Sequence, residues 1–145
     1  MEDKKNKIYI STLVIFWIIF AFFILNVSSM YLPFIPFIGF IGLPFNAAIS
    51  LLGIALIILV VRAKITKISR AFFILTGSSA IGIGFGAYLH NLVFALFIKL
   101  FGEGFWAGMG DEPVFFILAT IVCPIALLVG AIGSMVFIAK KKVIA

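Results

Sequence analysis

Charged residues are scarce in this chain, and the few that occur are confined to short stretches. Only 11% of the 145 residues are charged, whereas 65% are hydrophobic. A soluble domain carries about 25% charged residues, and a small soluble fold exposes too much surface to conceal so many apolar side chains. The composition therefore argues against a soluble protein and predicts a single domain, 1–145, embedded in a lipid bilayer.

Metal ligands and acid–base pairs are also missing. One histidine and one cysteine are too few to close a zinc or copper site within the chain. A single cysteine also excludes an intramolecular disulfide and a C-x-x-C redox pair. No Asp or Glu lies within 8–61, 71–98 or 114–139, so a buried carboxylate pair is excluded there. We therefore expect no metal, no cofactor and no enzymatic activity.

Long uncharged runs dominate the first half of the chain. The run 8–61 contains no charged residue and exceeds the about 20 residues that one membrane crossing needs. Three prolines fall within 32–44, where they remove backbone donors and disfavour helix. This pattern predicts helices over 8–31 and 45–61, joined by an apolar, proline-rich turn. The turn is either interfacial or re-entrant, because bare loop backbone cannot face hydrocarbon.

The second half of the chain adds two more apolar segments. Together with their connections they are a basic loop, 62–70; a helix, 71–98; a glycine-rich acidic loop, 99–112; and a helix, 113–139. Pro113 suits a first helical position, and Glu112 places negative charge at the positive end of that helix dipole. The predicted fold class is an all-α, polytopic membrane protein whose four transmembrane helices form two helical hairpins.

The basic residues are distributed unevenly between the two sides of the predicted membrane. Ten fall on one side: Lys4, Lys5, Lys7, Arg62, Lys64, Lys67, Arg70, Lys140, Lys141 and Lys142. Only Lys99 falls on the other side. The positive-inside rule then predicts that both termini are cytoplasmic in the cell or plasma membrane. Because these residues flank apolar runs, the net charge of +6 does not indicate a nucleic-acid partner.

Small residues recur at helical spacing on the third and fourth predicted helices. One stripe comprises Ser78, Gly82, Gly86 and His90; the other comprises Ala119, Cys123, Ala126, Gly130 and Gly133. Small side chains let helix backbones approach closely in lipid, so we expect these two helices to pack through the stripes. Pro124 withholds a donor from the carbonyl of Thr120, and we expect it to kink the fourth helix.

The candidate functional residues lie toward the outer side. His90 lies about 28 Å along the third helix from Ala71, at 1.5 Å per residue. Histidine changes charge near neutral pH, and Glu112 starts the next helix on the same side. We expect them to pair, so that protonation of His90 couples the outer loop to the helix contact; the alternative is a histidine that bonds only a carbonyl or water. Asn91 points about 100° away and should serve a different contact.

Two classes of function remain. The first is a non-catalytic accessory or scaffold subunit that packs against other membrane helices, in a homo-oligomer or a larger complex. The second is a small homo-oligomeric transporter or channel with a polar site around His90. A transporter needs a continuous polar path, built from Asn46, Ser50, Ser78, Ser79, His90, Asn91, Thr120 and Ser134. Because these residues are spread over several helix faces, the sequence favours the first class.

Overall fold

The computed structural model describes residues 2–31, 42–63, 65–106 and 112–140. Its elements, in order, are α1 (Glu2–Tyr31), α2 (Gly42–Arg62), α3 (Lys67–Phe101), the 3-10 turn η1 (Glu103–Trp106), α4 (Pro113–Ile117), the π-helical segment η2 (Leu118–Val122) and α5 (Cys123–Ala139). Four helical spans are long and apolar enough to cross a membrane: Lys7–Ser28, Pro44–Arg62, Lys67–Phe101 and Pro113–Ala139. The fourth span consists of α4, η2 and α5, which follow one another without a break.

The longest helix, α3, begins four residues earlier and ends three residues later than the predicted range 71–98. Its start is set by Thr66, whose side chain accepts a hydrogen bond from the backbone N–H of Ser69 and so satisfies a free donor of the first turn. Its end is set by Gly102, which has φ +88°, a conformation that glycine adopts without steric cost. Local capping, and not the limit of the apolar run, therefore determines the length of α3.

Two other helix starts differ from the predicted ones. α1 begins at Glu2, six residues before the predicted 8–31, because lysine and glutamate are good helix formers. α2 begins at Gly42 and places Pro44 in its first turn, where a missing N–H costs no hydrogen bond. Most of the predicted proline-rich turn, 32–41, lies outside the described residues, so the choice between an interfacial and a re-entrant turn stays open.

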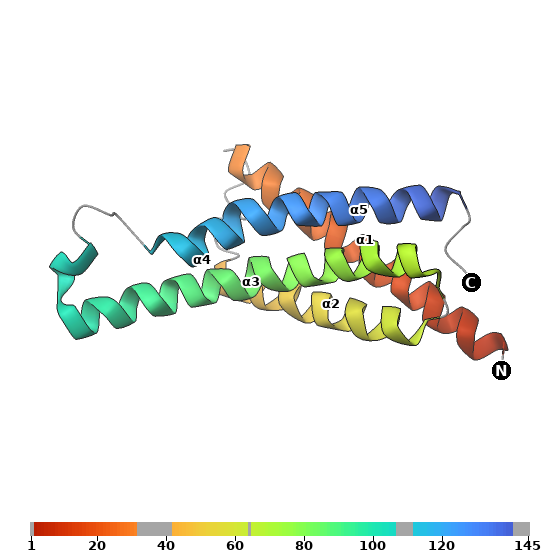
Figure 1. Ribbon diagram of the computed structural model, residues 1–145, viewed down its shortest axis with the longest axis horizontal. Coiled ribbons are helices and arrows are strands. Elements are labelled where there is room, and N and C mark those ends of the chain that lie inside the picture. Colours follow the sequence, from red (N-terminus) through yellow and green to blue (C-terminus); the bar gives the residue numbers. More distant parts are fainter. Residues whose placement is uncertain (1, 32–41, 64, 107–111, 141–145) are drawn as a thin grey trace.

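α3 is the central helix of the fold. It packs against α2 on one side and against α4, η2 and α5 on the other, while α1 crosses obliquely and packs mainly on α2 (Figure 1). The buried core joins all four spans: Phe16, Ile19, Ile49, Leu56, Phe73 and Leu127. The start of α1 and the end of α5 lie at the same end of the molecule (Figure 1), as an even number of spans requires.

Glycines bring α2 and α3 into close contact. A Cβ atom at Gly53 would lie 2.5 Å from the carbonyl oxygen of Gly77, and one at Gly84 would overlap the carbonyl oxygen of Asn46. Ser50 also donates a hydrogen bond to the carbonyl oxygen of Ile81, at 3.4 Å. This contact was not predicted from the sequence, because small residues at helical spacing do not show which neighbouring helix they face.

The contact between α3 and the fourth span uses small residues on both helices. A Cβ atom at Gly82 would overlap the Sγ atom of Cys123, and one at Gly86 would lie 3.1 Å from the Cβ atom of Ala119. Farther along α5 the partners on α3 are larger. Gly130 faces Thr76 and Gly133 faces the ring of Phe72, while Ala126 is half-buried.

Ser78 does not belong to this contact, contrary to the sequence analysis. Its side chain is exposed, whereas Ser79 and Thr76 are buried. Residues four apart on an α-helix are separated by about 400°, so each step of four turns the stripe by about 40°. Three such steps from His90 carry Ser78 about 120° away from the helix contact. The contact instead continues through Thr76, which faces Gly130.

Candidate functional site

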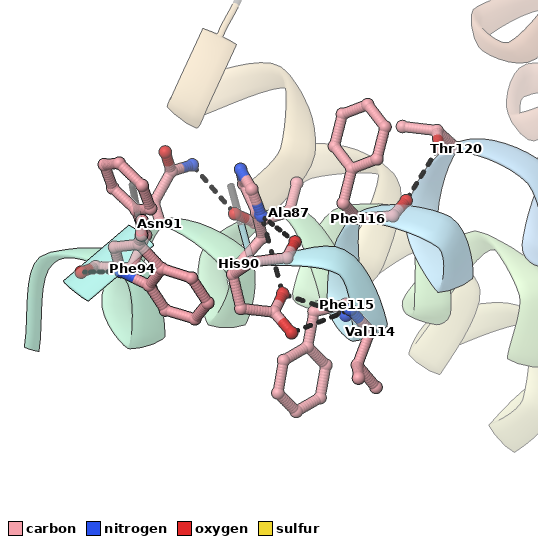
Figure 2. Close-up of polar contacts among 10 residues, drawn as sticks. Ala87, His90, Asn91, Phe94, Val114, Phe115, Phe116 and Thr120 are labelled. Atoms are coloured by element: carbon pink, nitrogen blue, oxygen red, sulfur yellow. Dashed lines mark hydrogen bonds and ion pairs between the residues drawn. The ribbon is translucent and has the colours of Figure 1, made fainter. Parts of the chain in front are cut away.

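His90 on α3 contacts Glu112, the residue that precedes α4, and Figure 2 shows the His90 ring beside the start of α4. The Nδ1 atom of His90 lies 3.5 Å from Oε2 of Glu112 and 3.1 Å from the main-chain oxygen of the same residue. Both neighbours of Nδ1 are acceptors, so the hydrogen bonds form when Nδ1 carries a proton. Through this contact the ring links α3 to the residue that caps the start of the next span.

The carboxylate of Glu112 has a second role as the cap of α4. It accepts hydrogen bonds from the backbone N–H groups of Val114, at 2.8 Å, and Phe115, at 3.0 Å. These are free donors of the first turn, and a negative charge there is favoured by the helix dipole. The Glu112 side chain is only 5% exposed, so its capping bonds and His90 satisfy it within the protein.

Aromatic rings surround this pair. The His90 ring lies 5.5 Å from the Phe116 ring and 6.4 Å from the Phe94 ring, centroid to centroid. The Phe94 ring stacks on Trp106 of η1 at 5.9 Å, and the Trp106 Nε1–H donates a hydrogen bond to the carbonyl oxygen of Phe94. The sequence analysis missed this cluster, although Phe94 follows His90 at the four-residue spacing that places side chains on one helix face.

The remaining predicted polar residues point elsewhere. Asn91 is exposed and donates a hydrogen bond from Nδ2 to the carbonyl oxygen of Ala87, at 2.8 Å, so it does not join His90 (Figure 2). Among the described residues no group of three His, Cys, Asp or Glu side chains is placed to hold a metal ion. The geometry of the His90–Glu112 pair joins α3 to the start of α4.

A helical irregularity lies below this site. The N–H of Cys123 bonds to the carbonyl oxygen of Leu118, five residues earlier, which defines the π-helical segment. Pro124 has no N–H to offer, so the chain cannot continue a regular ladder through this turn. The predicted disturbance at Pro124 thus takes the form of a π-helical turn, and in Figure 1 the span bends toward α3 there.

A cavity of about 330 Å³ lies beside this turn, and all four spans contribute to it. Its lining residues are Phe23, Asn26, Val27, Asn46, Ile49, Ile83, Ala87, Ala119, Thr120 and Pro124. Of the eight residues that a polar path would need, Asn46 and Thr120 line this cavity. Ser79 and Ser134 are buried elsewhere, and Ser78 and Asn91 are exposed. The lining of the cavity is therefore mainly apolar, with a few polar groups.

Comparison with protein-family models, curated proteins and solved structures finds no match to this chain.

Proposed function

We propose that this chain is a four-helix integral membrane protein with cytoplasmic termini, and that it acts as a non-catalytic subunit which binds another membrane protein. The binding surface is the outer part of α3, together with η1. The observation that carries this proposal is a row of exposed leucines on α3 that extends beyond the other helices.

The depth of this row follows from residue counts. The hydrocarbon core is about 30 Å thick, which an α-helix crosses in about 20 residues. Counting from Ala71, just after the basic start of α3, about 20 residues reach His90. Glu112, which directly precedes the next span, contacts His90 at this level. The 11 residues from Asn91 to Phe101 then extend about 16 Å farther, and α3 projects past the start of α4 in Figure 1.

The projecting part of α3 is apolar. Leu92, Leu96 and Leu100 are 62%, 46% and 63% exposed, and their four-residue spacing places them on neighbouring turns of one face. Phe101 is 63% exposed beside them. Within the hydrocarbon core, lipid would cover such a row of leucines. Outside the hydrocarbon core, these side chains would face water. A row of this kind fits the groove of a partner protein, as amphipathic helices do in helix-in-groove recognition.

The known polar contacts support a structural and not a catalytic role for the outer site. Glu112 caps α4 and contacts His90, and Trp106 donates a hydrogen bond to the backbone of α3. These contacts hold the outer ends of α3 and α4 together beside the leucine row. The site therefore stabilises the helix ends that carry the binding surface.

Site-specific photo-crosslinking in native membranes tests the proposal. A photoreactive residue at Leu96 should give a discrete adduct of higher mass, identifiable by mass spectrometry. The matched control is Ile132, which is 58% exposed on α5 and lies at hydrocarbon depth. It should give no protein adduct.

Failure of Leu96 to form any protein adduct, or equal adducts at Ile132, would refute the assigned surface. An adduct between two copies of this chain would contradict a different membrane protein as the partner and would assign the surface to a homo-oligomer.

A further inference from the structure

We propose that the cavity between α1, α2, α3 and η2 binds a neutral, single-chain amphiphile with a hydroxyl head group, of the class of long-chain alcohols. This inference goes beyond the subunit role and does not depend on the leucine row. It rests on the cavity's size, its lack of charge and a backbone carbonyl that the helix leaves without a donor.

The walls of the cavity select an apolar tail. Phe23, Val27, Ile49 and Ile83 supply aromatic and branched aliphatic surface. A volume of about 330 Å³ falls at the lower end of the range typical of ligand cavities, about 300–1,000 Å³. It suits a single chain better than a two-chain lipid. None of the described residues that line it is charged, so an ionised head group would be buried among them without a counter-charge, at high cost.

The polar groups of the cavity select a hydroxyl. Asn46 lines it with an amide that can donate and accept hydrogen bonds. Thr120 and Asn26 add further polar surface. A hydroxyl also both donates and accepts, so one such head group can bond to an amide and to a carbonyl at the same time. A carboxylate offers no donor, and a quaternary ammonium offers neither.

The π-helical turn supplies the matching acceptor. Because the N–H of Cys123 bonds to Leu118 and Pro124 has no N–H, the carbonyl of Ala119 receives no helical donor from either position. Ala119, Thr120 and Pro124 all line the cavity. Such π-helical turns occur frequently at functional sites, and a carbonyl without its helical donors in an apolar setting favours a ligand that donates to it.

The position of the cavity gives the ligand a route of entry. Thr120 lines the cavity and is also exposed on the surface of the helices, as is its neighbour Ile121. In the proposed membrane orientation this surface faces lipid in the outer half of the bilayer. A single-chain amphiphile can therefore enter sideways from the outer leaflet.

Photolabelling of the purified full-length chain in lipid nanodiscs tests this site. The probe is hexadecanol with a diazirine in the middle of its chain, and adducts are located by peptide mass spectrometry. We expect adducts at cavity residues such as Ile83. Excess hexadecanol should suppress them, whereas palmitate at pH 8 and hexadecyltrimethylammonium should not.

Two variants sharpen the result. Ala87→Phe places a ring in the cavity and should abolish the adducts, whereas Ala95→Phe, on an exposed face of the same helix, should leave them unchanged. Asn46→Leu removes one hydrogen bond to the head group and should weaken hexadecanol competition about 3–10-fold. If Ala87→Phe does not give a monodisperse protein, hexadecanol competition in Asn46→Leu is the test of the site.

Three outcomes would overturn the proposal. Equal labelling of Ile125 and Ile132, both exposed on α5, would indicate surface lipid only. Suppression by palmitate as strong as that by hexadecanol would remove the hydroxyl selectivity. Unchanged hexadecanol competition in Asn46→Leu would remove the assigned head-group contact. None of these results bears on crosslinking at Leu96, so this proposal and the subunit role can fail separately.

Discussion

Gly86→Leu should weaken the contact between α3 and the fourth span. A Cβ atom at Gly86 would already lie 3.1 Å from the Cβ atom of Ala119, and leucine adds three more carbons in a buried position. Overpacking of this kind costs up to about 3 kcal/mol. The better helix propensity of leucine returns about 0.8 kcal/mol. The expected net loss is about 2 kcal/mol, or about 30-fold in the unfolding equilibrium.

The single cysteine provides the assay. Cys123 is 8% exposed and faces Gly82, one turn from Gly86 along α3. A maleimide reaches its thiol only when the two helices separate, so the labelling rate reports the population of the opened state. We expect labelling in mild detergent to accelerate about 30-fold in Gly86→Leu, with unfolding at a lower mole fraction of sodium dodecyl sulfate.

The control is Gly104→Leu in η1, where an added Cβ atom meets no atom of the described residues within 4 Å. Its stability should remain within about 0.5 kcal/mol of the wild type. If Gly86→Leu matches the wild type in both labelling rate and unfolding, α3 and the fourth span do not pack through Gly86 as described.

Two further predictions concern orientation and the outer helix cap. A reporter that is active only in the cytoplasm should work when fused after Ala145 or within 62–70 and fail within 102–110; activity of the last fusion would contradict cytoplasmic termini. Glu112→Ala should destabilise the protein by about 1–2 kcal/mol in detergent unfolding, because it removes the cap of α4. Glu103→Ala, which changes an exposed acid, should have little effect; equal losses in both variants would argue against the cap.

The predicted four apolar helical spans agree with the structure because length and hydrophobicity are properties of the local sequence. The contacts at the start of α4 also agree with the prediction, for the same reason. Pro113 and the preceding acid indicated a helix start, and in the structure the Glu112 carboxylate accepts bonds from two N–H groups of that start. The sequence also placed His90 and Glu112 on one side, and the structure places their side chains 3.5 Å apart.

The errors arose where a pattern had to be converted into three-dimensional contacts. Ser78 matched the four-residue spacing but turns away from the contact, because that spacing drifts around an α-helix by about 40° per step. The glycine contact between α2 and α3 was missed, because small residues on one helix do not reveal which neighbour they face. Gly82 faces Cys123, whereas Gly84, two residues later, faces Asn46.

The sequence by itself determined the number of apolar spans, the helix start at Pro113 and the grouping of the charges between the spans, since each depends on neighbouring residues. Only the tertiary structure decided that α3 is central, that the π-helical turn lies beside a cavity, and that this cavity brings Asn46 and Thr120 together. These residues are far apart in the chain. Their meeting depends on helix crossings, which close packing of side chains from several helices sets jointly.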